Sequence, residues 1–475
     1  MEYPTDLFIG GEWRSGDCRF EVHEPATGEV LKTVADAGVD DALGALGAAH
    51  AAQPGWAALP ARQRSDALRR AFELMVARAD ALAELIVREN GKPIAEARGE
   101  VLYAAEFFRW FSEEAVRLDG RLAVAPSGTN RVMVMHQPIG VALLITPWNF
   151  PAAMATRKIG PALAAGCAVV LKPASETPLT ALAVAACLAE AGVPRGVVNV
   201  VPTTRNAEVV RALLRDSRVR KLSFTGSTEV GKLLLAQAAE RVVKCSMELG
   251  GNAPFIVFAD ADLDAAVEGA VIAKMRHNGE ACTAANRFYV EQPIAAEFTR
   301  RLTAAMAALK MGNGLDPEVR VGPLVDAATL EKVERLVDAA VSAGARAQTG
   351  GRRAPGRGFF YPATVLDRVA PDSPILREEI FGPVAPIVTF SAVDDVLRLA
   401  NDTDSGLVAY VYTRDLAAGL RVAEALECGM VGLNRGLVSD PSAPFGGTKQ
   451  SGLGREGGHE GLLEFTETKY IAVAI

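Results

Sequence analysis

The stretch Val141-Ala-Leu-Leu-Ile-Thr146 is a continuous apolar run, and two prolines follow it at 147 and 151. Runs without polar alternation are typical of strands that are buried on both faces of a parallel sheet. Further strand-like runs follow at 168–172, 197–201 and 221–225, and helical patterns lie at 151–165, 178–190, 207–214 and 227–239. This alternation predicts a doubly wound α/β domain, a fold that binds nucleotides at the carboxyl ends of its strands.

The chain on either side of this region predicts three more parts. The first 35 residues indicate β structure, because Gly10-Gly11 is a hairpin signal and residues 25–28 form a second turn. Residues 37–118 have helical patterning, with one long amphipathic stretch expected from Pro60 to Gly91. Residues 120–135 contain a strand-like run that predicts an arm or an ordinary hairpin. A second α/β alternation from 255 to 433 predicts another sheet-based domain, and the chain crosses between the domains at 248–252.

The composition excludes several classes of protein. The chain has 475 residues and a formal net charge of −7, and this negative charge does not indicate nucleic-acid binding. The longest apolar run, 161–171, is shorter than the roughly 20 residues of a membrane helix, and the first residues lack the pattern of a secretory signal. The 6 cysteines show no short spacing and the 5 histidines no cluster. We therefore expect no bound metal and a reducing compartment, the cytoplasm.

One cysteine stands in a context that favours chemistry over packing. Cys282 lies in the stretch Gly279-Glu-Ala-Cys-Thr-Ala-Ala-Asn-Arg287, between a helical pattern at 261–276 and a strand-like run at 287–291. Most cysteines are small core hydrophobes, but small and polar neighbours after a glycine indicate a loop. A second unusual run, 247–252, contains the carboxylate Glu248. A loop thiol with a carboxylate partner is a candidate nucleophile with its base.

Several segments predict anion or cofactor binding. The run Gly226-Ser-Thr-Glu-Val-Gly-Lys-Leu233 follows a strand and opens a helix, which suits a phosphate group. A nucleoside-triphosphate loop needs a hydroxyl where Leu233 stands, so we favour a dinucleotide phosphate. Lys172 ends a strand and is either solvated or directed at a ribose; Ser175, in place of an acidic residue, would tolerate a 2′-phosphate. The GxGxxG match at 452–457 has too little chain after it for a nucleotide-binding unit and indicates a tight loop.

Polar residues elsewhere leave two interpretations open. Asn149 lies between two prolines, either in a packing turn or as an amide that donates to an oxyanion. Arg157 and Arg276 are either surface charges or cations that point into the same cleft.

Seven segments in the same order resemble the aldehyde dehydrogenase superfamily, and they extend over essentially the whole chain. They are 146–151, 172–175, 224–228, 248–251, 279–282, 378–383 and 444–447. The resemblance implies two doubly wound parallel-sheet domains and a small β oligomerisation arm in a homodimer or homotetramer. The implied ranges are 1–118 and 139–249 for the dinucleotide-binding domain, 250–445 for the catalytic domain, and 119–138 with 446–475 for the arm and C-terminal strand.

The resemblance also implies residue roles. Cys282 would be the nucleophile, Glu248 the base that activates water, and Asn149 an oxyanion donor. The implied cofactor is NADP, with NAD usable, and its contacts would be Trp148, Lys172, Ser175, Gly226, Ser227, Leu249, Glu379 and Phe381.

Within the superfamily the chain most resembles the succinate-semialdehyde dehydrogenases, through 155–158, 172–175, 275–279 and 436–439. Arg157, Arg276 and Ser439 stand where that family holds the substrate carboxylate. Two positions depart from the family pattern. Ala284 replaces a second cysteine, which removes a disulfide switch, and Arg435 follows Asn434 where a threonine is expected.

Other functions remain open at this stage. One is a dehydrogenase for another carboxylated semialdehyde, such as glutarate or 2-oxoglutarate semialdehyde. Another is a thiol esterase that uses Cys282, Glu248 and Asn149 without a cofactor. A third is a non-catalytic binding protein on the same scaffold.

Overall fold

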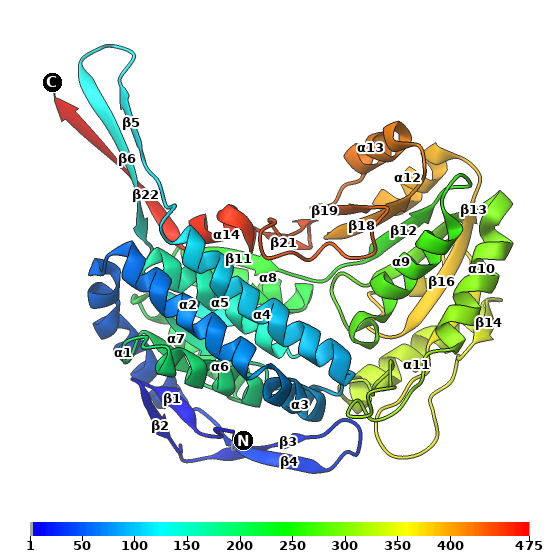
Figure 1. Ribbon diagram of the computed structural model, residues 1–475, viewed down its shortest axis with the longest axis horizontal. Coiled ribbons are helices and arrows are strands. Elements are labelled where there is room, and N and C mark those ends of the chain that lie inside the picture. The colour runs from blue at the N-terminus through cyan, green and yellow to red at the C-terminus, as the bar shows by residue number, and fades with distance from the viewer. Residues whose placement is uncertain (1–2, 475) are drawn as a thin grey trace.

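The computed structural model describes residues 3–474, which form two lobes and a projecting arm (Figure 1). Met1, Glu2 and Ile475, at the outer ends of the expected domain ranges, lie outside the described residues. Each lobe is built around a predominantly parallel sheet, and the arm is a small antiparallel sheet that extends away from the first lobe. The expected α/β fold class is confirmed.

The first lobe contains an 8-stranded sheet in the order β2-β1-β9-β8-β7-β10-β11-β21. Its parallel centre consists of β7 (Val141–Ile145), β8 (Ala168–Lys172), β9 (Val198–Val200), β10 (Val219–Thr225) and β11 (Lys244–Glu248). The hairpin of β1 (Leu7–Ile9) and β2 (Glu12–Arg14) adds antiparallel strands at one edge, and β21 (Gly452–Leu453) pairs antiparallel at the other. A separate hairpin joins β3 (Arg19–His23) and β4 (Val30–Ala35).

Helices cover both faces of this sheet, because alternate residues of the buried strands enter two different cores. Leu144 of β7 packs with α2 (Ala61–Ala77), α3 (Ala79–Asn90), α4 (Ile94–Glu114), α5 (Pro151–Ala165) and α6 (Pro178–Glu190). Leu143 packs with α1 (Val39–Ala58), α7 (Asn206–Arg215) and α8 (Thr228–Ala239). This two-sided burial explains the unbroken apolar run at 141–145. The single amphipathic stretch expected from Pro60 to Gly91 is two helices, since the chain turns at Arg78.

The second lobe contains a 7-stranded sheet in the order β14-β15-β16-β13-β12-β18-β19. Its strands are β12 (Ala253–Val257), β13 (Ala285–Glu291), β14 (Arg346–Thr349), β15 (Thr364–Asp367), β16 (Val384–Phe390), β18 (Val408–Tyr412) and β19 (Met430–Leu433). All neighbours run parallel except β14 and β15. Two cores again lie on opposite faces, one with α9 (Leu263–Met275) and α10 (Gln292–Ala307), the other with α11 (Ala327–Ser342), α12 (Val393–Asn401) and α13 (Leu416–Ala425). The chain enters this lobe immediately after β11.

The arm is an antiparallel sheet of β5 (Arg121–Val124), β6 (Asn130–Pro138) and β22 (Thr466–Ala474) (Figure 1). The rest of the C-terminal segment lies elsewhere. β20 (Thr448–Lys449) pairs with β17 (Ser405–Gly406), β21 joins the first sheet, and α14 (Gly458–Leu463) packs beside α5. The GxGxxG match is therefore an edge strand followed by a turn in which Gly454, Gly457 and Gly458 have positive φ. Within residues 3–474, no helix combines the length and apolarity needed to cross a bilayer.

Candidate active site

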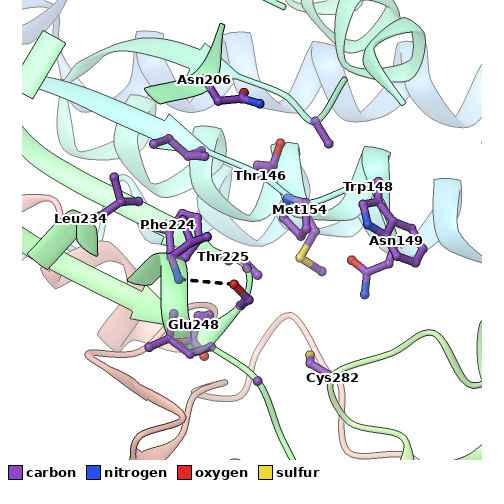
Figure 2. Close-up of a pocket in the computed structure, with 18 of the residues that line it drawn as sticks. Thr146, Trp148, Asn149, Met154, Asn206, Phe224, Thr225, Leu234, Glu248 and Cys282 are labelled. Atoms are coloured by element: carbon purple, nitrogen blue, oxygen red, sulfur yellow. Dashed lines mark hydrogen bonds between the residues drawn. The ribbon is translucent and has the colours of Figure 1, made fainter. Parts of the chain in front are cut away.

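A groove of about 600 Å³ lies at the carboxyl ends of the first sheet's strands and is completed by loops of the second lobe. Its size is in the range of small-molecule sites. All the residues expected to be catalytic or to hold the cofactor line it: Trp148, Asn149, Lys172, Ser175, Gly226, Ser227, Glu248, Leu249, Cys282, Glu379 and Phe381. Figure 2 shows the side chains of Asn149, Glu248 and Cys282 around the same open space. Arg157, Arg276 and Ser439 are not in its lining.

The Cys282 loop is formed by an unusual backbone turn after α9. The 3-10 helix η1 (Arg276–Gly279) contains two non-glycine residues in the left-handed region, His277 (φ 49°) and Asn278 (φ 53°). Gly279 also has a positive φ, and a Cβ there would lie 2.2 Å from the carbonyl oxygen of Gly382. The Asn278 side chain holds the turn, since it accepts from Gly322 N (2.8 Å) and donates to the Pro323 oxygen (3.0 Å). Such strained turns are typical of functional loops.

The thiol of Cys282 is protonated at neutral pH in the absence of other molecules. Burial raises its pKa to about 12, which the Arg157 guanidinium opposes and the Glu379 and Glu248 carboxyls reinforce. A thiol in this state is a weak nucleophile and needs a base or a change of surroundings to become reactive.

Asn149 connects the two lobes at the thiol. It lies just before α5, and its side-chain nitrogen donates to the backbone carbonyl of Glu280, 3.0 Å away in the Cys282 loop. A side-chain amide has two N–H donors, so one orients the group and the other is available to a ligand. The arrangement can therefore present a directed N–H beside the sulfur, as an oxyanion donor requires.

Glu248 ends β11 and is 2% exposed. Among the described residues, neither of its carboxylate oxygens has a hydrogen-bond partner. Burial raises the pKa of Glu248 well above its usual value and the nearby Glu456 raises it further, while Arg157 and Lys158 oppose the shift. A carboxyl with an elevated pKa and free oxygens suits a general base that works near neutral pH.

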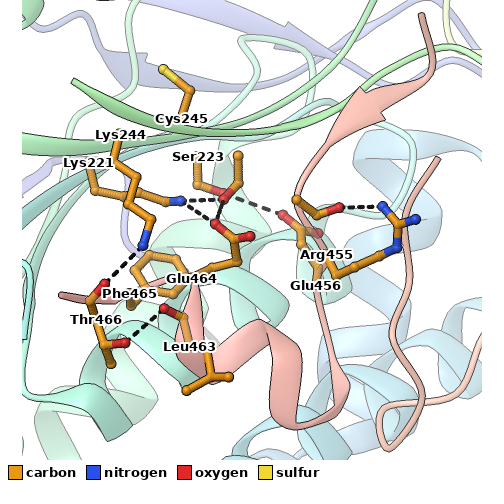
Figure 3. A network of polar contacts seen from close by, with 12 residues as sticks. Lys221, Ser223, Lys244, Cys245, Arg455, Glu456, Leu463, Glu464, Phe465 and Thr466 are labelled. Carbon is orange, nitrogen blue, oxygen red and sulfur yellow. Dashed lines mark hydrogen bonds and ion pairs between the residues drawn. The ribbon is translucent and has the colours of Figure 1, made fainter. Parts of the chain in front are cut away.

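Arg157, expected to contact substrate, is buried and already paired. It forms an ion pair with Glu456, which also pairs with Lys158, the next residue of α5. Although burial acts against its charge, the pair with Glu456 raises the pKa of Arg157. Glu456 lies beside Ser223 in a buried polar network that also contains the Lys221–Glu464 pair (Figure 3). The guanidinium therefore has one partner before any ligand arrives.

Arg276 and Ser439 contact each other directly. The Arg276 Nη1 donates to Ser439 Oγ at 3.0 Å, and its guanidinium carbon lies 4.7 Å from the ring centroid of Phe150. The guanidinium also lies 5.6 Å from the ring of Tyr103, a residue that the sequence did not single out. Burial raises the pKa of Tyr103, and the nearby Arg157 and Arg276 lower it. Both arginines thus face one tyrosine, which packs on Phe107 of α4 and which no local sequence pattern marked.

The far end of the groove contains a helix N-terminus and a lysine. Ser227 caps α8 by accepting from Val230 N at 3.3 Å, and Gly226 N donates to the Glu248 carbonyl at 3.1 Å. Lys172 donates to Asn206, a lining residue absent from the sequence prediction, and burial lowers the pKa of Lys172 to about 8. The N-terminus of a helix and a lysine fit the phosphates and ribose of a dinucleotide.

At the other end, Glu379 accepts from the Gly251 N–H at 3.1 Å, and burial raises its pKa to about 7. Phe381 has a positive φ of 56° and packs edge to face on Trp148, with ring centroids 5.4 Å apart. A carboxylate and a rigid aromatic pair fit a ribose and a flat heterocycle. The groove residues as a whole fit a nicotinamide dinucleotide.

Two parallel-sheet lobes around a nucleotide-sized groove with one cysteine define a class of dinucleotide-linked thiol enzymes. The chain matches the model of the Aldehyde dehydrogenase family over residues 13–471, and it belongs to that family. It is 57% identical to a succinate-semialdehyde dehydrogenase of Paenarthrobacter nicotinovorans, over 94% of this chain and 99% of that protein. It is 50% identical to a glutarate-semialdehyde dehydrogenase of Pseudomonas putida, over 100% and 98%. A crystal structure of an E. coli NADP dependent enzyme superposes with a TM-score of 0.98 at 48% identity, covering 100% of this chain and 98% of that one.

Proposed function

We propose that this protein oxidises succinate semialdehyde to succinate with NADP, and that NAD also serves. The observation that carries the substrate assignment is the Arg276–Ser439 contact, with a second guanidinium, Arg157, facing the same tyrosine. Both arginines act electrostatically on the Cys282 thiol, so a carboxylate held by them lies near the reacting sulfur. The name of the P. nicotinovorans relative supports the same substrate.

In this proposal Cys282 attacks the aldehyde carbon once its thiol has lost a proton. The oxyanion that forms accepts hydrogen bonds from the free N–H of the Asn149 amide and from the Cys282 backbone N–H. One such donor typically lowers the barrier by about 3–4 kcal/mol. Oxidised nicotinamide supplies a hydride acceptor when bound. Loss of hydride leaves a thioester on Cys282, and Glu248 removes a proton from the water that hydrolyses it.

The preference for NADP is supported by residues at the far end of the groove. Lys172 provides a cation, and Ser175 leaves room where a carboxylate would repel a 2′-phosphate. Glu176 also lines the groove and accepts from Ser175 Oγ at 3.3 Å, so it offsets part of the lysine charge. This balance supports NADP as preferred cofactor with NAD still usable, and the NADP dependence of the similar E. coli enzyme agrees with it.

A second candidate substrate is glutarate semialdehyde, which the P. putida relative's name favours. The test is a panel of four- and five-carbon carboxylated semialdehydes and neutral aldehydes of matched length, each with NADP and with NAD. Formation of reduced nicotinamide is followed by absorbance. The proposal expects the highest kcat/KM for succinate semialdehyde with NADP. A higher kcat/KM for the five-carbon semialdehyde would select the second candidate. No formation of reduced nicotinamide with any aldehyde, together with ester hydrolysis in the absence of cofactor, would select the thiol esterase.

We also propose a homodimer or homotetramer assembled through the arm. Its sheet exposes apolar side chains on a projecting element, including Leu122 (68% exposed) and Tyr470 (58%). Large exposed apolar residues gathered on one element are typical of interaction surfaces. We propose the cytoplasm as location, supported by 6 cysteines without disulfide spacing. Light scattering on the purified protein tests the assembly, and a stable monomer would contradict it.

A further inference from the structure

The segment between α3 and α4 contacts the two loops on which the proposed chemistry depends. Asn90, the last residue of α3, donates from its side chain to the Trp148 carbonyl at 3.1 Å. Four residues later, Ile94 N donates to the carbonyl of Gly314 in the second lobe at 2.8 Å. The segment therefore lies against the turn that contains Asn149 and also reaches the lobe that contains Cys282.

Lys92 is the buried centre of this segment. Its Nζ donates to the backbone carbonyl of Asn149 at 2.8 Å and forms an ion pair with Glu100 of α4. The ammonium also lies 4.1 Å from the ring centroid of Phe150, and both charged side chains are at most 1% exposed. The carbonyl of Asn149 lies just before α5. Removal of Lys92 would take away the donor that this buried carbonyl accepts from, and a buried carbonyl that loses its donor costs free energy.

Glu100 holds the residues on the other side of Asn149. Its Oε1 accepts from the backbone nitrogens of Ala152 (2.9 Å) and Ala153 (3.3 Å), in the first turn of α5. A carboxylate at this position satisfies helix N–H groups that have no partner inside the helix. Together, Lys92 and Glu100 hold the Asn149 turn by its carbonyl and by the helix that begins after it.

The same segment reaches the Cys282 loop. Glu96, one turn before Glu100 on α4, accepts a hydrogen bond from the backbone nitrogen of His277 in η1. The Asn149 side chain in turn donates to the Glu280 carbonyl of that loop. The position of the Asn149 amide relative to the sulfur therefore depends on contacts with residues 92–100 as well as on the loops themselves.

We propose that Lys92 is a positioning residue, which places the Asn149 amide opposite Cys282 through its bond to the Asn149 carbonyl. The inference rests on the proposed role of Asn149 as oxyanion donor. A buried ion pair alone contributes little net stability, because desolvation of the two charges opposes their attraction. The hydrogen bond from Lys92 to the Asn149 carbonyl fixes the position of that carbonyl, and an apolar residue of equal volume cannot form it. Misplacement of a catalytic group by about 1 Å lowers rates by about 10²-fold.

The test is a double-mutant cycle of Lys92→Met and Asn149→Ala in the full-length protein with succinate semialdehyde and NADP. We expect each single variant to lower kcat by about 10²-fold. In the Asn149→Ala background, Lys92→Met should lower kcat by less than about 3-fold further, because the group it positions is gone. The Kd of NADP, measured by fluorescence without aldehyde, should stay within about 2-fold in Lys92→Met, since Lys92 does not line the groove.

Two further variants separate positioning from stability. Lys92→Met leaves Glu100 as an unpaired buried charge, whereas Lys92→Met/Glu100→Gln removes both charges and should restore thermal stability but not kcat. Glu89→Gln is the matched control, because Glu89 accepts from Leu179 N and Thr180 N at the start of α6 in the same way, without contacting Asn149. It should lower stability and leave kcat within about 3-fold.

The outcomes distinguish a failure of the proposed function from a failure of the inference about Lys92. If Asn149→Ala leaves kcat unchanged, the proposed oxyanion role is wrong and the inference about Lys92 fails with it. If Asn149→Ala slows catalysis but Lys92→Met multiplies that loss in full, Lys92 does not act through Asn149, and only the inference about Lys92 fails. Recovery of kcat in Lys92→Met/Glu100→Gln would also overturn the inference about Lys92, since lower stability would then account for the lower kcat of Lys92→Met.

Discussion

Replacement of Arg276 by methionine removes a charge from the proposed substrate site with little loss of packing. The Arg276 guanidinium lies against the rings of Phe150 and Tyr103 and donates to Ser439 Oγ at 3.0 Å. Methionine is shorter than arginine, but it is flexible and packs well against aromatic rings, so part of the contact with both rings is retained. What Arg276→Met removes is a cation that can donate two hydrogen bonds to a carboxylate.

The expected magnitude follows from the kind of hydrogen bond that is lost. Hydrogen bonds to charged groups contribute about 1.5–3 kcal/mol each, so a two-bond contact contributes about 3–6 kcal/mol. Arg276 is half-buried, and solvent screening favours the lower end of that range. A loss of about 3 kcal/mol corresponds to about a 100-fold lower kcat/KM for succinate semialdehyde. A neutral aldehyde of the same carbon number makes no such contact, and its kcat/KM should change by less than about 3-fold.

The assay compares kcat/KM for succinate semialdehyde and for butanal in the original protein and in the variant. Ser439→Ala serves as a matched control, because it removes a single hydrogen bond to a charged group, and about 1.5 kcal/mol predicts a loss of about 10-fold. Arg157→Met is a less selective perturbation. It takes one partner from the buried Glu456, so both aldehydes should lose rate and the Tm should fall.

Two results would refute this reasoning. Equal losses on both aldehydes in Arg276→Met would mean that the residue supports the loop and not the carboxylate. An unchanged kcat/KM for succinate semialdehyde would remove Arg276 from the substrate site altogether. The Kd of NADP provides the check on folding, because the Arg276 side chain is not in the groove lining.

Other predictions follow from the site and the arm. Glu248→Gln should lower steady-state turnover by about 10²–10⁴-fold and leave an acyl adduct on Cys282, detectable by mass spectrometry; absence of the adduct would contradict its role in hydrolysis. Burial raises the pKa of Cys282 to about 12, so its thiolate fraction grows as the pH rises. Alkylation of the protein without cofactor should therefore speed up about tenfold per pH unit from pH 7 to pH 10. A rate that levels off by about pH 9 would contradict this prediction. Ser175→Glu should lower kcat/KM for NADP by about 10-fold or more and leave that for NAD nearly unchanged, and equal effects would exclude a 2′-phosphate at this position. Leu122→Asp with Ile471→Asp should convert the assembly to monomers in light scattering, and an unchanged mass would place the interface elsewhere.

Much of the fold could be predicted from local patterns. The run at 141–146 predicted β7, which ends at Ile145, and the repeat after it predicted the alternating order of strands and helices. The break at Arg78 within the stretch from Pro60 to Gly91 was missed, because no proline or glycine marks it. The C-terminal segment 446–475 was expected to stay with the arm. Its short strands pair instead with different sheets, and strands of two residues have too little pattern to be recognised.

Some residues of the candidate site could likewise be predicted from local patterns, and others could not. The segments that line the groove could be selected because loop residues with special chemistry stand at the ends of predicted strands and helices. Tyr103, Asn206 and Glu456 could not be selected, since each meets its partners in the site from a distant part of the chain. Glu456, for instance, pairs with Lys158 across 298 positions. No local pattern indicates that two adjacent cations, Arg157 and Lys158, will meet the same buried carboxylate.

The sequence by itself determined the types and order of the elements, because hydrophobic periodicity and turn residues act over a few neighbouring positions. Only the tertiary structure decided which charges are free. Buried charges must find partners in a medium of low dielectric constant, and packing brings those partners together from distant segments. Arg157 is therefore paired with Glu456, Arg276 contacts neutral groups (the Ser439 hydroxyl and two aromatic rings), and Lys92 holds Asn149 across 57 positions.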